Sequence, residues 1–320
     1  MASPGARVSN WIFPHRGPES GVVVLTQRRV YILPTGQGLL FGATLGLLLI
    51  GSINYNLSLG YVLTFLLAGL GVVTMLHTWR NLAHLALRPG RVSPVFAGEH
   101  AVFDVTLENH AAFDRVAIGV VRTDSTPAYA DIPIQGAASA AIAVRAEQRG
   151  IMRLGRFRVF TTFPLGLFRA WSNIELDEHC VVYPRPEAGD PPLPAASIVS
   201  GEGGAHGRGS EDFAGLRQYH PGDSLRHVAW KAFARGDQLL TKQFGGRAGS
   251  ELWLDWALVP AEFTIEQKLS RLARWLVAAE AQGESYGVRL PGREFGPGSG
   301  ARHRDACLEA LALFEMPGSP

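Results

Sequence analysis

One long uncharged stretch near the N-terminus dominates the hydrophobic pattern of the chain. No Asp, Glu, Lys or Arg occurs from Gly38 to Leu76. As a single helix this stretch would be about 58 Å long, almost twice the hydrocarbon thickness of a bilayer. The polar residues 54–56 (Asn-Tyr-Asn) interrupt it and suit a turn at a membrane surface. The pattern therefore predicts two membrane spans, at about 38–53 and 57–76, joined as a helical hairpin.

Two other interpretations of the first span fit less well. A signal peptide is disfavoured because some 37 residues precede the span, with strand-like runs at Val22–Leu25 and Val30–Leu33. No small-residue cleavage site follows the span either. A helical hairpin buried inside a soluble protein is the remaining alternative.

Basic residues flank the predicted hairpin on both sides, and its turn carries no charge. They are Arg7, Arg16, Arg28 and Arg29 before the first span, and Arg80, Arg88 and Arg91 after the second. Because positive charge stays on the cytoplasmic side of a membrane, this distribution predicts a multi-pass protein of the bacterial inner (cell) membrane with both termini in the cytoplasm. Residues 80–320 then form a cytosol-facing body.

After the hairpin, the pattern changes to period two. Apolar positions alternate or run for strand length between turn residues, which is typical of β-strands. The predicted strands are 101–108, 115–122, 140–145, 155–163 and 179–184. Strands at this spacing without helices predict a small antiparallel β-sandwich, similar to an immunoglobulin-like module in layout only.

The sequence pattern of the C-terminal part is typical of an α/β domain. Residues 252–256 and 286–290 are predicted as strands, and 304–314 as a helix. Between the strands, Thr264 and Gln267 fit a capping box at the start of a helix that ends at Gly283. A strand–helix–strand–helix order implies a small parallel sheet.

The overall fold class is therefore α+β and membrane-anchored, with a transmembrane hairpin, a sandwich and a small α/β domain. The predicted segments are an N-terminal cytoplasmic segment at 1–37, the hairpin at 38–79, the sandwich at 90–186, a Pro- and Gly-rich linker at 187–208, a distinctive segment at 209–250 and the α/β domain at 251–320.

The 209–250 segment, called the signature segment below, is unusually rich in aromatic and charged residues. Asp223 suits an N-cap, with a Pro-Gly turn before it, and a helix is predicted from Ser224 to Arg235. Arg226 and Trp230 border its apolar stripe, where they could stack as a cation–π pair. The candidate binding residues of the segment are Asp212, Arg217, Tyr219, Asp223, Arg226, Trp230, Lys231 and Arg235.

Three roles remain open for this segment. Its basic face can dock an acidic partner surface or support the protein's own fold. A catalytic or metal site would use His206, Asp212, His220, Asp223 and His227, but the spacing has no HExxH or HxH pattern. An anion site for phosphate or acidic lipid headgroups would use Arg217, Arg226, Lys231 and Arg235.

Composition adds two limits. The net charge of +2 gives no argument for a nucleic-acid partner. The two cysteines, Cys180 and Cys307, lie far apart and predict structural thiols in a reducing compartment rather than a disulfide framework. A nucleophile elbow, a Walker loop and a zinc signature are all absent from the sequence.

The signature segment resembles that of bacterial membrane proteins grouped as domain of unknown function 58. The matching pattern is Asp212-Phe213, Leu216-Arg217, Tyr219, Gly222-Asp223, Arg226, Trp230-Lys231 and Ala234-Arg235. The hairpin turn at 54–57, the run at 163–169 (Phe-Pro-Leu-Gly-Leu-Phe-Arg) and the segment 182–186 (Val-Tyr-Pro-Arg-Pro) agree with that family. The resemblance covers roughly residues 25–256.

The resemblance implies that the C-terminal domain is similar to a von Willebrand factor type A domain. Such domains bind a divalent metal through an Asp-x-Ser-x-Ser motif after the first strand. Here Asp255 is followed by Ala257 and Val259, so both serine hydroxyls are missing. The domain is also reduced in length, to residues 251–320. The degenerate site at Asp255 is expected to hold no metal, and no cofactor is implied.

The resemblance also implies partners. These are MoxR-type AAA+ ATPases and proteins with intact von Willebrand type A domains, beside membrane transglutaminase-like proteins. The sequence thus predicts a non-enzymatic adaptor or scaffold of the inner membrane, working with a MoxR-type ATPase in a chaperone-like or envelope-assembly complex. The alternatives are a hydrolase using His and Asp residues of 206–227, and an anion- or lipid-headgroup-binding module.

Overall fold

The computed structural model describes residues 17–123, 125–194, 213–218, 240–244 and 252–315. Within them the chain is an α+β protein with long helices and several antiparallel sheets. It divides into two compact units, with the main boundary between Arg185 and Pro186. The first is called the β-unit and the second the α/β unit, and each is described by itself.

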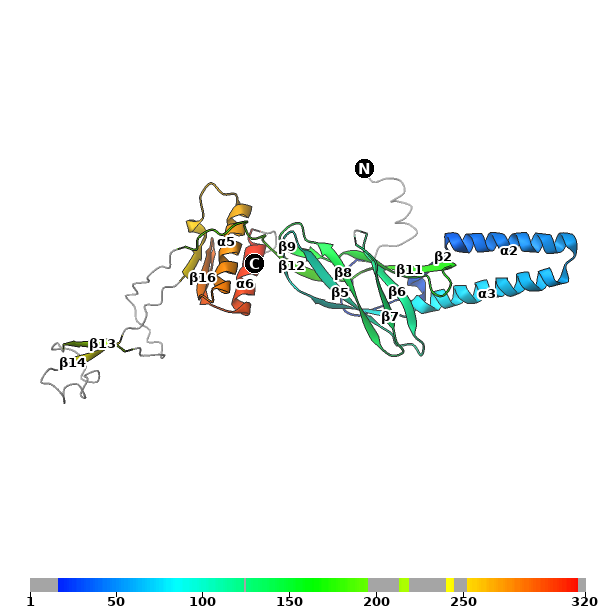
Figure 1. Cartoon of the computed structure of the whole chain (residues 1–320), viewed down its shortest axis with the longest axis horizontal. Helices are drawn as coiled ribbons and strands as arrows, with labels where there is room; N and C mark the ends of the chain where they lie inside the picture. Colours follow the sequence, from blue (N-terminus) through cyan, green and yellow to red (C-terminus); the bar gives the residue numbers. More distant parts are fainter. Residues whose placement is uncertain (1–16, 124, 195–212, 219–239, 245–251, 316–320) are drawn as a thin grey trace. The chain divides into compact units, whose positions relative to one another are not determined.

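Two apolar helices extend from the β-unit (Figure 1). Helix α2 spans Gly36–Tyr55 and helix α3 spans Ser58–Leu82, and both are long and apolar enough to cross a membrane. Most of their large side chains face outward, including Leu40, Leu47 and Leu59. Apolar side chains that face outward along the length of a helix are suited to contact with lipid rather than with water. The prediction of two apolar helices is confirmed, and both are longer than the spans expected from the sequence.

Small and hydroxyl residues lie where the two helices meet. Ser52 is buried and donates its hydroxyl to the Leu48 carbonyl at 2.7 Å. A Cβ at Gly60 would collide with the Ser52 hydroxyl, so glycine permits the close approach at this point. Close packing through small residues is how helices associate in a membrane. The turn uses Asn56 in the left-handed conformation, which Asn tolerates better than most residues.

The β-unit consists mainly of two antiparallel sheets. The first has the strand order β1-β3-β5-β8, formed by Val23–Val24, Ala86–Val92, His100–Glu108 and Ala137–Arg145. The second has the order β2-β11-β10-β6-β7, formed by Tyr31–Pro34, Phe168–Glu175, Arg156–Thr161, Arg115–Val121 and Ala128–Ile132. The buried side chains of both sheets belong to one hydrophobic core, which includes Phe103, Leu107, Ile142, Ile118 and Phe157.

A third, smaller sheet completes the β-unit. Its order is β4-β12-β9, formed by Val95–Phe96, His179–Tyr183 and Gly150–Arg153, and its β4–β12 pair is parallel. The five predicted strands are confirmed within a few residues. The strand-like runs before the hairpin are also strands, because β1 pairs with β3 and β2 pairs with β11. Residues 17–34 thus belong to the β-unit by backbone pairing.

The α/β unit contains a parallel strand pair, as predicted. Strand β15 (Leu252–Asp255) pairs in parallel with β16 (Tyr286–Leu290), and helix α5 (Ile265–Ala281) connects them. The capping box between Thr264 and Gln267 is confirmed. The sequence reading missed β17 (Arg293–Gly298), which pairs antiparallel with β16 before helix α6 (Ala301–Leu313).

The start of the predicted linker is bound to helix α5. Glu187 forms a two-pronged ion pair with Arg271, and its backbone N–H donates to the Ser270 carbonyl at 3.0 Å. Asp190 pairs with Arg274 at 2.7 Å. In the part of the signature segment that the structure describes, β13 (Phe213–Gln218) and β14 (Leu240–Phe244) form an antiparallel ladder.

Both cysteines are buried and unpaired, as expected of structural thiols. Cys180 lies in β12 of the β-unit and Cys307 lies in α6. Burial raises the pKa of both, that of Cys307 to about 12. Thiols held in this way are protonated at neutral pH and unreactive.

The β-unit also buries a carboxyl group, that of Glu178, which is 6% exposed. Among the described residues neither of its side-chain oxygens has a hydrogen bond of normal geometry. Burial, reinforced by the charge of Asp104, raises the pKa of Glu178 to about 7, and the Gly90 backbone N–H only partly opposes this. The folded state therefore holds a proton on Glu178 at pH values where the unfolded chain has released it.

This burial predicts that the protein loses stability as the pH rises. Between pH 4.5 and 7 the folded state binds more protons than the unfolded state, so the free energy of unfolding falls through this window. Glu178→Gln should match the wild type at pH 4.5 and be more stable at pH 8, by roughly 2–3 kcal/mol. Thermal melting of the full chain in detergent across this range measures the difference. Glu147→Gln, at an exposed site, is the control, and equal pH profiles for all three proteins would contradict the prediction.

Candidate functional site

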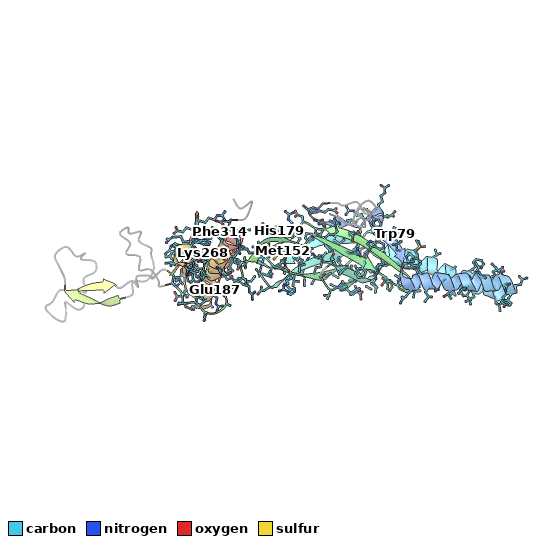
Figure 2. The ribbon with its side chains drawn as sticks, turned by 90° about the horizontal axis from the view of Figure 1, so that it is seen from above. Trp79, Met152, His179, Glu187, Lys268 and Phe314 are labelled. Atoms are coloured by element: carbon cyan, nitrogen blue, oxygen red, sulfur yellow. The ribbon has the colours of Figure 1, made fainter. Side chains whose placement is uncertain are left out.

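Helix α3 does not stop at the predicted end of the second span. It continues to Leu82, and its last turn lies inside the β-unit, where Leu82 is fully buried and Trp79 packs against the core. Figure 2 shows Trp79 at the end of the β-unit from which the helices leave. The hydroxyl of Thr78 donates to the Phe163 carbonyl at 2.8 Å. We call this region, where α3 enters the β-unit, the junction.

Asn81 of the junction acts as a strand partner for β6. Val116 lies in an irregular part of that strand, where the pairing with β7 shifts and β10 has ended. The Asn81 amide donates to the Val116 carbonyl at 2.8 Å, and the Val116 N–H donates back to the Asn81 side-chain oxygen at 3.2 Å. The amide also donates to the buried Thr161 hydroxyl at 3.0 Å. Helix α3 thereby satisfies both backbone groups of Val116, where no neighbouring strand in the described part of the chain pairs with β6.

Arg115 of β6 caps the C-terminal end of helix α3. Its side chain is 1% exposed, and its guanidinium donates to the carbonyls of Asn81 at 2.6 Å and Ala83 at 2.8 Å. The last carbonyls of a helix have no partners within the helix and carry partial negative charge. A buried guanidinium supplies both the missing donors and a compensating positive charge.

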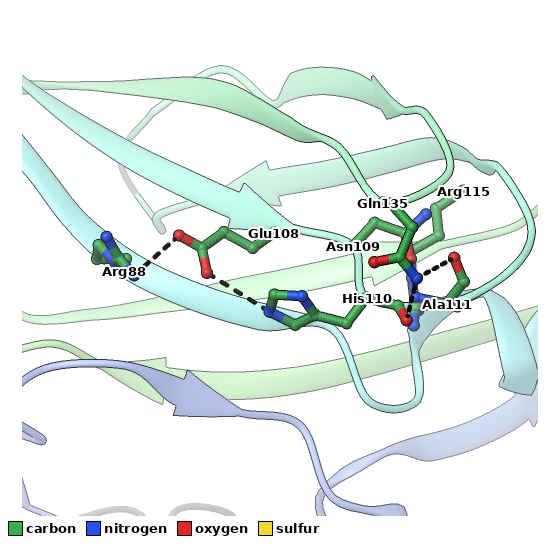
Figure 3. Close-up of polar contacts among 7 residues, drawn as sticks. All are labelled: Arg88, Glu108, Asn109, His110, Ala111, Arg115 and Gln135. Carbon is green, nitrogen blue, oxygen red and sulfur yellow. Dashed lines mark hydrogen bonds and ion pairs between the residues drawn. The ribbon is translucent and has the colours of Figure 1, made fainter.

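Asn109 holds Arg115 from the other side. Its side-chain oxygen accepts from the Arg115 Nε at 2.8 Å, and its amide donates to the Phe113 carbonyl at 2.8 Å and the Pro133 carbonyl at 3.0 Å. Figure 3 shows Asn109 beside Arg115, with Gln135 bonded to the neighbouring turn. The rotamer of Arg115 is therefore fixed by neighbours on both sides.

The charge of Arg115 persists despite its burial. Burial, helped by the nearby charge of Arg80, lowers its pKa to about 10, which still leaves it protonated at neutral pH. The Arg80 guanidinium lies 4.0 Å from the centroid of the Phe113 ring, and that of Arg115 lies 5.3 Å from it. The junction thus combines a buried cation with a ring that both guanidinium groups approach.

Most candidate binding residues of the signature segment lie outside the described residues. These are Asp212, Tyr219, Asp223, Arg226, Trp230, Lys231 and Arg235, together with the predicted helix 224–235. Arg217 is placed by its backbone alone, in β13 opposite Thr241 of β14. The roles of these residues stay predictions, as does the alternative site that uses His and Asp residues of 206–227.

Asp255 lies at the carboxyl end of β15, where ligands commonly bind in open α/β sheets. Its side chain accepts from the Ala257 N–H at 2.8 Å and pairs with Arg289 at 3.4 Å. Arg289 also contacts Glu294 at 3.0 Å and stacks 4.2 Å from the centre of the Trp253 ring. No group of three or more possible metal ligands occurs among the residues that the structure describes. The carboxylate is thus engaged by the Ala257 backbone N–H and by one arginine.

A cysteine and a histidine lie close together in the α/β unit. The Cys307 sulfur is 3.7 Å from Nε2 of His303, and that nitrogen is 2.8 Å from the Tyr286 carbonyl. A catalytic thiol needs a lowered pKa and access to substrate. Cys307 is fully buried and its pKa is raised to about 12, so this pair has a structural role.

The sequence reading missed Arg115, Asn81 and Asn109. The sequence pattern predicts Arg115 only as the first residue of a strand, and it predicts that the second span ends near residue 76, before Asn81. One signal was present: no glycine or proline breaks the chain between Leu76 and His84, and buried positions recur at Thr78 and Leu82. This spacing is typical of a helix that continues into a core.

Comparison with known proteins gives one distant likeness. No family model matches the chain. Over 171 residues, 52% of the chain, it is 29% identical to the uncharacterized protein YeaD of Bacillus subtilis (strain 168). The matched part is 43% of that protein, so the chain spans less than half the length of this relative.

The geometry of the junction predicts a large effect of removing Arg115. Arg115→Leu removes the buried donor of the Asn81 and Ala83 carbonyls. It also removes one of the two donors of the Asn109 oxygen, which keeps the Ala111 N–H. The expected loss is roughly 3–4 kcal/mol in the free energy of unfolding. Arg115→Lys keeps the charge but not the forked geometry, so it should be destabilised by an intermediate amount. Chemical denaturation of the full chain in detergent, followed by tryptophan fluorescence, measures both.

Arg158→Leu is the matched control, since Arg158 is an exposed arginine of β10 in the same sheet. Its loss should change the free energy of unfolding by about 0.5 kcal/mol or less. Equal effects of Arg115→Leu and Arg158→Leu would show that the junction does not depend on the buried guanidinium.

Proposed function

We propose that this chain is a non-enzymatic adaptor or scaffold of the bacterial inner membrane. Helices α2 and α3 cross the membrane as a hairpin, both termini are cytoplasmic, and the β-unit and α/β unit present surfaces to partners. The observation that carries the proposal is the junction, in which Arg115 and Asn81 fix the end of an apolar helix inside the β-unit. A firm connection of this kind suits a protein that holds partners at a defined place on a membrane.

We propose further that the chain is a member of the domain of unknown function 58 group, with a reduced von Willebrand type A-like domain at its C-terminal end. The support is the ordered pattern in the signature segment and the parallel β15-α5-β16 crossover, which is compatible with a reduced von Willebrand type A-like domain. The partner is then a MoxR-type AAA+ ATPase. In the described residues, the buried thiol of Cys307 and the engaged carboxylate of Asp255 favour no catalytic role.

The topology can be tested by cysteine labelling. Ser58 is exposed at the turn of the hairpin and Ser93 is exposed between β3 and β4, whereas Ser52 is buried and unsuitable. A membrane-impermeant maleimide added to intact spheroplasts should label Ser58→Cys and leave Ser93→Cys unlabelled. The native cysteines are buried and should stay silent. Labelling at position 93 with protection at 58 would reverse the orientation and place the β-unit outside the cytoplasm.

Affinity capture tests the adaptor role. The full chain, solubilised from membranes, should bring down a MoxR-type ATPase. Lys231→Glu combined with Arg235→Glu should weaken capture, and wild-type capture should fall as salt rises, because the predicted basic face binds an acidic surface. Arg145→Glu combined with Arg153→Glu is the matched control, since both arginines are exposed on the β-unit. Equal capture by all variants would show that the signature segment is not part of the interface. Failure of every protein, including the wild type, to capture an ATPase would contradict the proposed partner.

A further inference from the structure

The loop at 162–167, between β10 and β11, is attached to both apolar helices. The Thr35 hydroxyl, just before α2, donates to the Gly166 carbonyl at 2.6 Å, and the Thr35 N–H donates to the Leu167 carbonyl at 2.9 Å. On the other helix, the Thr78 hydroxyl donates to the Phe163 carbonyl at 2.8 Å. A Cβ at Gly38 would strike the Leu167 carbonyl, so α2 passes close to the loop. The backbone of the loop is thereby fixed.

The apolar side chains of the same loop are not covered in the same way. Phe163 is 36% exposed and Leu165 is 51% exposed, and Leu33 of β2, on the strand that leads into α2, is 58% exposed. Scattered apolar side chains on a protein surface need no explanation. These are different because they lie beside helices with outward-facing apolar side chains: β2 leads into α2, and the loop is hydrogen-bonded to Thr35 and Thr78.

The level of the loop along the helices can be estimated from the sequence. The uncharged stretch ends at Leu76, and Thr78 lies two residues further, about 3 Å along the helix axis. The headgroup layer on each side of the hydrocarbon is roughly 5–7 Å thick. Phe163, bonded to Thr78 through its carbonyl, therefore lies at the level where the hydrocarbon gives way to headgroups. Two exposed arginines border the hairpin in sequence on this side: Arg28 precedes β2 and α2, and Arg80 lies in the last turn of α3.

We propose that the 162–167 loop is a membrane-contact element that inserts Phe163 and Leu165 into the lipid headgroup and acyl boundary. The leaflet is the one from which the β-unit projects, and the occupant of this surface is lipid. The proposal rests on the hairpin crossing the membrane. Together with α2 and α3, the loop gives the β-unit a third contact with the bilayer and so restrains its tilt.

The test uses an environment-sensitive nitrobenzoxadiazole dye on one introduced cysteine at a time in the full chain, whose two native cysteines are buried, reconstituted into phosphatidylcholine–phosphatidylglycerol vesicles. Leu165→Cys reports on the loop. Leu66→Cys reports on the hairpin, since Leu66 is 69% exposed in α3. Ile151→Cys is the matched control: Ile151 is also apolar and 59% exposed, but lies in β9, next to Met152 and far from Trp79 in Figure 2. Lipids with a doxyl quencher near the headgroup or deep in the acyl chain give the depth.

The shallow quencher is expected to reduce the emission of the dye at position 165, and the deep quencher that of the dye at position 66. Neither quencher should reduce the emission of the dye at position 151. Quenching at Leu66 without quenching at Leu165 would overturn the loop proposal and leave the hairpin in place. Quenching at neither position would overturn the membrane hairpin itself. A dye at Leu165 that shifts to the blue but is not quenched by either lipid would mean that protein, not lipid, covers the loop.

Discussion

The β-unit depends on a buried cation, Arg115, most of whose hydrogen-bond acceptors are carbonyls at the end of helix α3. Arg115 is held at 1% exposure by the carbonyls of Asn81 and Ala83 and by the side chain of Asn109. A guanidinium that is buried without acceptors is strongly unfavourable, so β6 cannot pack in its observed position unless α3 ends beside it. The sheet and the helix therefore form one cooperative structure.

This constraint changes how the hairpin relates to the rest of the β-unit. The hairpin is inserted between β2, which ends at Pro34, and β3, which begins at Ala86, and both strands belong to the β-unit. Both helices of the hairpin are thus connected to the β-unit through hydrogen-bonded strands rather than through flexible segments. A displacement of α3 would have to break the Asn81 and Arg115 bonds. Such a connection is suited to holding an attached unit at a fixed angle to a membrane.

The parts of the fold that follow from local pattern were predictable from the sequence. The absence of charge from Gly38 to Leu76 revealed the two helices, and Thr264 and Gln267 revealed the start of α5. The junction was not predictable, because Arg115 and Asn81 are 34 residues apart and their meeting depends on the packing of the whole unit. Strand β17 was missed for a local reason: its Gly-Pro-Gly end is typical of a loop. Most of the signature-segment residues that carry the family resemblance lie outside the described residues, so their roles rest on the sequence alone.

A polar junction does something that an apolar one would not. A purely apolar helix end is held in place only by the fit of its side chains, because apolar contacts are not directional. A slip of one residue would rotate α3 by about 100° and move Asn81 away from both backbone groups of Val116. The hydrogen bonds of Asn81 and Arg115 therefore fix the rotation of the helix as well as its depth. Because the 162–167 loop is bonded to Thr78 three residues earlier, its position relative to the outward-facing side chains of α3 is fixed by the same bonds.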